Sequence, residues 1–245
     1  MRIHRSPIPS LVAAAAVAAC TPARPALDPA LAREEVLAVQ GRDGWRIGQR
    51  VRFGEFEAGD VARDATRGGD ASRTTATATR QTSRRRQQFR FTLRGGTDTA
   101  PAFRGRCDVT LRARDRLLGS GVSVSEGYRQ AVDCQLDAAD GVRWRLALAE
   151  TDTTRMGGRL AREDGQGPPY VVRPVARFEG TRLETARAVA WEFVLDGRAL
   201  GAVAQANGGS VVLPRRYGDE VRRTLAAASA ALLLYDVLEA PATEP

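Results

Sequence analysis

Hydrophobic and polar residues alternate along much of the chain. In one segment Phe89, Phe91 and Leu93 share one parity, with polar residues between them. A period of two is typical of a β-strand that buries one face. The same pattern recurs at Val51 and Phe53 and in three later segments, namely Cys107, Val109 and Leu111, then Val132, Cys134 and Leu136, then Val142, Trp144, Leu146 and Leu148.

Turn residues separate several of these segments. Asp140-Gly141, Asp196-Gly197 and Asn207-Gly208 are pairs that suit two-residue hairpin turns, which need a positive φ at their central positions. The stretch "VAWEFVLDGRALGAVAQANGGSVVLP", residues 189–214, therefore predicts a three-stranded meander. The alternation and the turns together predict a long antiparallel sheet.

A helix is predicted near the C-terminus, in "DEVRRTLAAASAALLLYDVLEA". Asp219 is the expected cap, and Pro241 follows its end. From Leu225 to Tyr235 the residues are apolar on every side, and this run is too short to cross a bilayer. We predict a core helix over Glu220–Glu239. The fold class is then β-rich α+β, with an antiparallel meander forming a barrel or a strongly curved sheet around or against this helix.

The order of elements resembles the tubby C-terminal-like fold of scramblases and LURP-one-related proteins, in which a barrel closes around a hydrophobic helix. The resemblance covers residues 89–239 and rests on "GRALGAVAQANGGSVVLP" followed by "AALLLYDVL". It implies an enclosed helix, and it brings no phosphoinositide-binding or calcium-binding residue to this chain. The alternative is a helix that lies across an open sheet or sandwich.

The N-terminal stretch "LVAAAAVAAC" follows Arg2 and Arg5 and is too short for a membrane span. A positive start, an apolar middle and small residues predict a signal peptide over residues 1–19. Val17, Ala18, Ala19 and Cys20 resemble the lipobox of bacterial lipoproteins. That resemblance implies that the Cys20 thiol is diacylated and that the signal peptide is then cleaved before Cys20. The alternative is an ordinary secretory signal.

The lipoprotein resemblance implies a cell-envelope location. The anchored protein would lie on the periplasmic face of an outer membrane, or on the outer face of the plasma membrane where no outer membrane exists. Prolines 22, 25 and 29 predict an extended tether over residues 20–33, although 29–40 could also form a short helix. We therefore predict a single globular domain over residues 34–239 and a tail over residues 240–245.

Two further cysteines, Cys107 and Cys134, share the parity of the inward residues of their predicted strands. In an oxidising compartment such a pair predicts one disulfide bond. A metal site is the competing interpretation, but it would lack histidine ligands.

The composition excludes several kinds of catalytic and metal site. The single histidine, His4, lies in the predicted signal peptide, and every basic residue is arginine. Triads with histidine, zinc sites with histidine ligands and lysine Schiff bases are therefore excluded from the mature chain. Paired carboxylates remain possible. Asp133 and Glu192 are expected on solvated strand faces. We expect no enzymatic activity, no cofactor and no metal.

The segment 64–88, "DATRGGDASRTTATATRQTSRRRQQ", has no aromatic residue and no aliphatic residue larger than alanine. It predicts a mobile loop, because it cannot bury enough surface to offset its ordering entropy. Arg84, Arg85 and Arg86 in this loop could bind an anionic partner, or they could simply be solvated charges.

Three functions remain open. The first is a non-enzymatic, lipid-anchored envelope protein that binds a protein or an anionic lipid through its outer surface or loops, with no nucleic acid expected. The second is a carboxylate-dependent hydrolase of envelope glycans, which requires a carboxylate pair in a cleft. The third is a polyanion binder that acts through Arg84–Arg86, and basic side chains converging from several strands would favour it.

Overall fold

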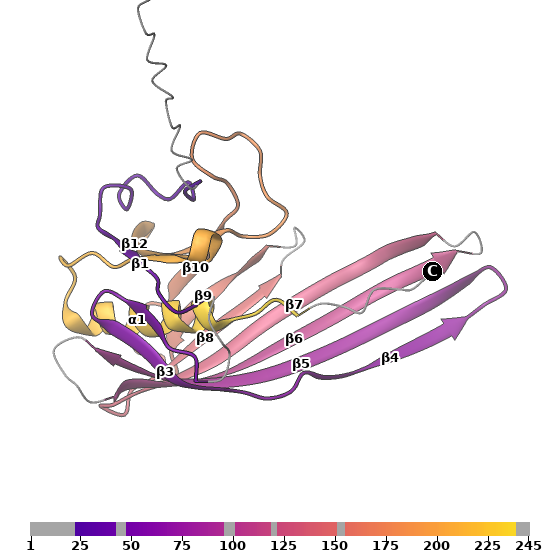
Figure 1. The fold of residues 1–245 in the computed structure, drawn as a ribbon, viewed down its shortest axis with the longest axis horizontal. Coiled ribbons are helices and arrows are strands. Elements are labelled where there is room, and N and C mark those ends of the chain that lie inside the picture. The colour runs from indigo at the N-terminus through magenta and orange to yellow at the C-terminus, as the bar shows by residue number, and fades with distance from the viewer. Residues whose placement is uncertain (1–22, 43–47, 96–100, 119–121, 151–154, 239–245) are drawn as a thin grey trace, which may run out of the picture.

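The computed structural model describes residues 23–42, 48–95, 101–118, 122–150 and 155–238 (Figure 1). The described residues form thirteen strands, one short 3-10 turn and one α-helix, α1 (Asp219–Leu234). The strands are β1 (Val36–Ala38), β2 (Val51–Phe53), β3 (Phe56–Arg63), β4 (Arg67–Thr74), β5 (Ala78–Gly95), β6 (Pro101–Leu118), β7 (Ser123–Ala138), β8 (Arg143–Glu150), β9 (Met156–Arg162), β10 (Tyr170–Val175), β11 (Ala190–Leu195), β12 (Arg198–Ala204) and β13 (Ser210–Val212).

The strands form one antiparallel sheet that curls into a barrel. Its order is β1-β13-β12-β11-β10-β9-β8-β7-β6-β5-β3-β2, and β4 pairs with β5 outside this path. The two ends of the sheet meet because the backbone of Gln40, just after β1, pairs with Arg52 of β2. The Gln40 N–H donates to the Arg52 carbonyl at 2.9 Å, and the reverse bond is 3.0 Å. The predicted meander over residues 189–214 is confirmed as β11, β12 and β13.

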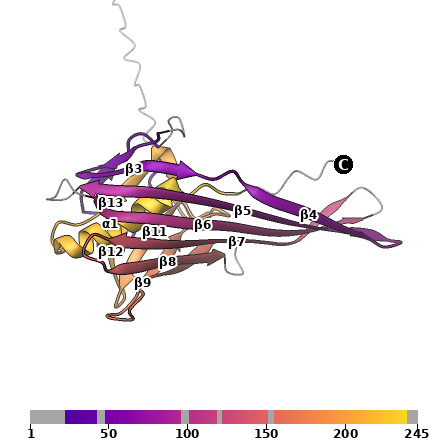
Figure 2. The ribbon, with the colours of Figure 1, turned by 90° about the horizontal axis from the view of Figure 1, so that it is seen from below.

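Helix α1 lies inside this barrel (Figures 1 and 2). Every residue from Thr224 to Tyr235 is buried, including five alanines of the helix. Small residues on the surrounding strands allow close approach. At Gly201 of β12, for example, an added Cβ would lie 3.3 Å from the side chain of Leu225. The predicted fold class is therefore confirmed, with the helix enclosed by the sheet.

The helix is shorter than predicted. It begins after Gly218 rather than after Asp219, and it ends at Leu234 instead of Glu239. Side chains from three other segments bind its last carbonyl groups and so end it without a further helical turn. The Arg42 side chain donates to the Leu233 carbonyl, the Arg63 side chain to the Leu234 carbonyl, and the Gln205 side chain to the Leu232 carbonyl.

The prediction of a mobile loop over residues 64–88 is wrong. Most of this segment forms β4 and the first half of β5, and β5 is hydrogen-bonded to β4 on one side and to β6 on the other. Burial of apolar surface is not what orders it. The backbone ladders on both sides of β5 satisfy its polar groups, and its continuation, Phe89–Leu93, is fixed in the barrel core.

This hairpin belongs to an arm that projects from the barrel. Figures 1 and 2 show β4 and the far halves of β5, β6 and β7 extending beyond the part of the sheet that surrounds α1. We call this projection the arm; its residues are 67–86, 112–118 and 122–129. The arm exposes both of its faces to a large extent, unlike the barrel wall.

The described part of the predicted tether, residues 23–33, is also not free. Residues 29–34 form turns instead of the helix considered for 29–40, and the chain is already packed on the barrel from Pro25 onward. Leu31 is fully buried against Ala199, Ala202 and Val212, which point outward from β12 and β13. These small apolar residues provide a docking surface that the proline-rich sequence alone does not reveal.

Candidate functional site

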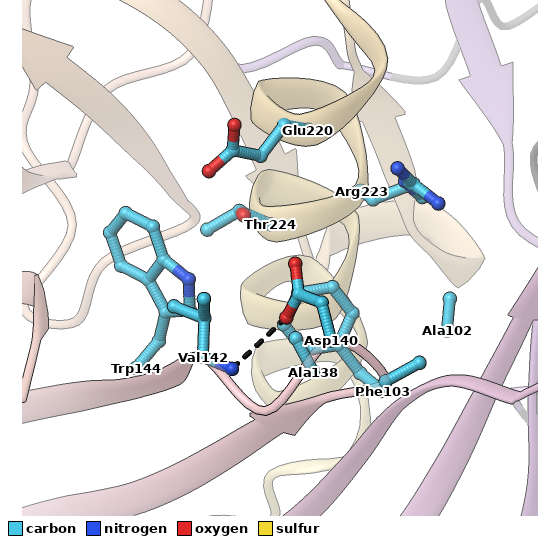
Figure 3. Close-up of a pocket in the computed structure, with 10 residues that line it drawn as sticks. Ala102, Phe103, Ala138, Asp140, Val142, Trp144, Glu220, Arg223 and Thr224 are labelled. Atoms are coloured by element: carbon cyan, nitrogen blue, oxygen red, sulfur yellow. Dashed lines mark hydrogen bonds between the residues drawn. The ribbon is translucent and has the colours of Figure 1, made fainter.

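Helix α1 fills the centre of the barrel, where the residues from Thr224 to Tyr235 are buried. Among the described residues, one hollow of about 310 Å³ lies at the barrel mouth beside the first turns of α1 (Figure 3). Trp144, Phe103, Asp140, Glu220 and Arg223 line part of it. Asp140 accepts a hydrogen bond from the Val142 N–H at 3.0 Å and so stabilises the β7–β8 turn.

This hollow does not favour the hydrolase alternative. Glycoside hydrolysis needs a carboxylic acid that an apolar environment keeps protonated, together with a second carboxylate. Asp140 and Glu220 are both exposed. The geometry therefore supplies no acid of the required kind at the mouth.

A partly buried carboxyl group lies near the other end of α1. Burial raises the pKa of Glu150, whose carboxylate accepts the Gln130 N–H at 2.8 Å. The cavity beside it measures about 120 Å³. Among the described residues that line this cavity, Glu150 has no second carboxylate beside it, so the pair needed for hydrolysis is missing.

The strongest feature of the outer surface is a row of arginines across three strands of the arm. Arg84 of β5 stands directly opposite Arg112 of β6, and Arg112 stands opposite Arg129 of β7. Adjacent strands are separated by about 4.8 Å, and like charges placed directly opposite each other destabilise a sheet. All three residues are exposed. Folding alone does not explain this row.

The row is part of a larger basic surface on the outward parity of β5, β6 and β7. Further pairs of opposing arginines are Arg80 with Arg116 and Arg90 with Arg106. We call this surface the arginine face; its members are Arg80, Arg84, Arg86, Arg90, Arg104, Arg106, Arg112, Arg114, Arg116 and Arg129. The basic side chains thus converge from three neighbouring strands.

Acidic neighbours neutralise only part of this face. Arg86 binds Asp108, with a Nε–Oδ1 distance of 2.9 Å, and this contact raises the pKa of Arg86 and lowers that of Asp108. Arg80 binds Glu126 at 2.9 Å. Within the part of the chain that the structure describes, the row of Arg84, Arg112 and Arg129 has no carboxylate partner. These three guanidinium groups are free to bind an external anion.

Of the three arginines predicted as one site, Arg84 and Arg86 lie on the outer face of β5 and Arg85 lies on the other face. They lie on a strand, so successive side chains point to opposite faces. Arg85 is turned toward the inner face of the arm and binds Asp70 at 2.9 Å. Arg84 remains unpaired on the outer face, and its partners in the row were missed. A signal for them was present in "LRARDR", residues 111–116, which places an arginine at every second position.

The other predicted residues have different outcomes. Cys107 and Cys134 stand opposite each other on β6 and β7, fully buried, with an S–S distance of 2.05 Å. Asp133 is exposed as expected and binds Arg145. Glu192 is not solvated: its side chain is 3% exposed and binds Arg173 at 2.6 Å. Cys20 and the predicted signal peptide lie outside the described residues.

Comparisons with known proteins add no assignment: no family model, no curated protein and no solved structure matches the chain. No helix within the described ranges has the length and apolarity that crossing a membrane requires. In the same ranges, histidine, cysteine, aspartate and glutamate do not gather in groups of three that could hold a metal ion.

Proposed function

We propose that this protein is a lipid-anchored, non-enzymatic protein of the bacterial cell envelope, and that its arginine face binds anionic lipid headgroups. The observation that carries the proposal is the unpaired row of Arg84, Arg112 and Arg129. A basic residue near an anionic lipid surface contributes about 1 kcal/mol to binding. Arginine also suits phosphate, because its planar donors can bind two oxygens at once.

The shape of the face supports a surface as the partner. The row crosses three strands of an extended sheet, and the other members of the arginine face lie along these strands, so the charges of the face spread in two dimensions. Such a layout fits many headgroups of a bilayer better than one small anion. Helix α1 occupies the centre of the barrel, which agrees with binding on the outside.

Vesicle sedimentation tests the lipid-binding half of the proposal. The chain that begins at Cys20 keeps every residue that the structure describes. We expect it to sediment with vesicles of phosphatidylglycerol and phosphatidylcholine, and not with phosphatidylcholine alone. The variant R84Q/R112Q/R129Q should lose this binding. A matched control, R159Q/R182Q/R198Q, removes the same charge from exposed positions elsewhere and should keep it.

Metabolic labelling with a fatty acid tests the anchor. Full-length protein expressed in a bacterial host should incorporate the label, and Cys20→Ser should not. An unlabelled wild-type protein would contradict the lipoprotein half of the proposal and leave the arginine face to be judged by the vesicles.

A further inference from the structure

The N-terminal segment is fixed to the outside of the barrel close to Cys20. Pro25 pairs with Phe178, the Ala26 N–H donates to the Arg177 carbonyl at 2.9 Å, and the Glu179 N–H donates to the Arg24 carbonyl at 2.8 Å. Contacts with the body begin three residues after Cys20, where the Ala23 carbonyl accepts a hydrogen bond from the Asn207 side chain at 2.7 Å. Little chain is therefore left between the predicted lipid and the folded body.

The buried Glu192 fastens this segment further. Its carboxylate accepts the backbone N–H of Asp28 and also binds Arg173, whose guanidinium lies 3.5 Å from the Asp28 carboxylate. Breaking a buried, paired carboxylate away from its partners is costly. Together with Leu31 on β12 and β13, this cluster holds residues 25–31 on one side of the barrel.

That side is opposite the arginine face. Leu31 packs on the outside of β12, and β12 lies six strands from β6 in either direction around the ring. Figure 1 agrees with this order, because residues 23–35, in indigo, lie across the body from β5 and β6. The five residues from Cys20 to Pro25 span at most about 18 Å when extended. An anchor at Cys20 would therefore hold the docked side toward its membrane.

We propose that the protein bridges two lipid surfaces: the acyl chains on Cys20 enter one membrane, while the arginine face binds anionic headgroups of a second membrane that faces the first. This inference rests on the proposed function. The short docked linker keeps the arginine face from turning to the anchoring membrane. The arm, which projects sideways from the barrel, then lies along the second surface.

The far end of the arm has the composition of a membrane contact. Val124 stands opposite Arg116, on the same outward parity as the arginine face, and is 45% exposed. Val122 beside it is 52% exposed. Apolar side chains next to arginines allow shallow insertion beneath anionic headgroups. A soluble anionic polymer would gain nothing from these valines, so a lipid surface is the partner that the tip favours.

The test uses Cys20 as a chemical handle. The chain has three cysteines, and two of them are joined and buried. The chain from Cys20 can therefore be coupled through this thiol to a maleimide lipid in sucrose-loaded phosphatidylcholine vesicles. Fluorescent acceptor vesicles then contain either phosphatidylglycerol and phosphatidylcholine or phosphatidylcholine alone. We expect the coupled protein to sediment anionic acceptors at least about tenfold more than neutral ones.

The matched variants test the orientation. R84Q/R112Q/R129Q should abolish acceptor recruitment, and R159Q/R182Q/R198Q should retain it. When the donor vesicles also contain phosphatidylglycerol, the native linker should still recruit acceptors. An insertion of about 40 Gly/Ser residues after Pro22 lengthens the linker by about 35 Å, which lets the arginine face turn back to the donor membrane. Recruitment of acceptor vesicles should then fall.

Two results would overturn the inference in distinguishable ways. If uncoupled protein binds anionic vesicles but coupled protein engages its own anionic donor membrane with the native linker, bridging is wrong and the proposed function stands. If uncoupled protein binds heparin but no anionic vesicle, the partner is a polyanionic polymer and both proposals fall.

Discussion

Arg84 and Arg112 face each other across β5 and β6, exposed and without an acidic partner between them. A sheet selected for stability alone would place opposite charges or neutral residues at such a position. The pair thus marks the part of the surface where folding alone does not account for the residues present, and where we propose that an anionic partner binds.

Replacing the central arginine of the row should not harm the fold. Arg112→Gln relieves repulsion from both Arg84 and Arg129, and each such pair costs about 0.2–1 kcal/mol. We expect the free energy of unfolding in urea to stay unchanged or to rise by up to about 1 kcal/mol. A loss of more than that amount would mean that Arg112 has a structural role, and the functional interpretation of the row would weaken.

The enclosed helix should be essential to the fold. Leu233, in the last turn of α1, is 2% exposed. Leu233→Ala removes packed methyl groups and leaves a cavity, which costs about 2–5 kcal/mol. Thermal melts of the chain from Cys20 should show a clearly lower midpoint. An unchanged midpoint, or a folded β domain after truncation at Gly218, would show that the helix is peripheral.

The bond between Cys107 and Cys134 should strengthen the root of the arm. In the chain-entropy model a loop of this length contributes about 3–4 kcal/mol. Peptide mapping without reducing agent should recover the linked pair from exported protein. C107A/C134A should lower the midpoint of denaturant unfolding. Two free thiols in the exported protein would contradict the assignment.

Glu150 should make stability depend on pH. Burial raises its pKa above the ordinary value of 4.5, so the folded state binds this proton more tightly than the unfolded state. The resulting stabilisation is complete below pH 4.5 and is lost as the pH rises through the folded pKa. Glu150→Gln keeps an acceptor for the Gln130 N–H and removes the charge. It should therefore be more stable than wild type at pH 7. Equal stability of both proteins at pH 7 would contradict the pKa shift.

The sequence was most informative where one strand face is buried. Cys107 and Cys134 were placed inward correctly, because alternation reports the parity of a side chain directly. The hydrophobic run around Leu233 likewise indicated a helix surrounded on all sides. These predictions depend on the local pattern of hydrophobic and polar residues, which can be seen in a single sequence.

The failures share a different cause, since each depends on contacts between distant segments. Residues 64–88 looked disordered because the backbone pairing that orders them leaves no mark on composition. Glu192 looked solvated, but a segment more than 160 residues away in the sequence covers it. The row of Arg84, Arg112 and Arg129 needs the register of three strands, which alternation does not provide.

The affinity of the two triple variants for anionic vesicles tests the central claim most directly. Wild-type chain from Cys20 is titrated with phosphatidylglycerol-containing vesicles at low salt, beside R84Q/R112Q/R129Q and R159Q/R182Q/R198Q. Three headgroup contacts of about 1 kcal/mol each predict that the arginine-face variant binds about 100-fold more weakly. The control should stay within about threefold of wild type, because its charges lie outside the proposed contact. Equal losses in both variants would show that net charge alone drives binding, and the arginine face would not be a site.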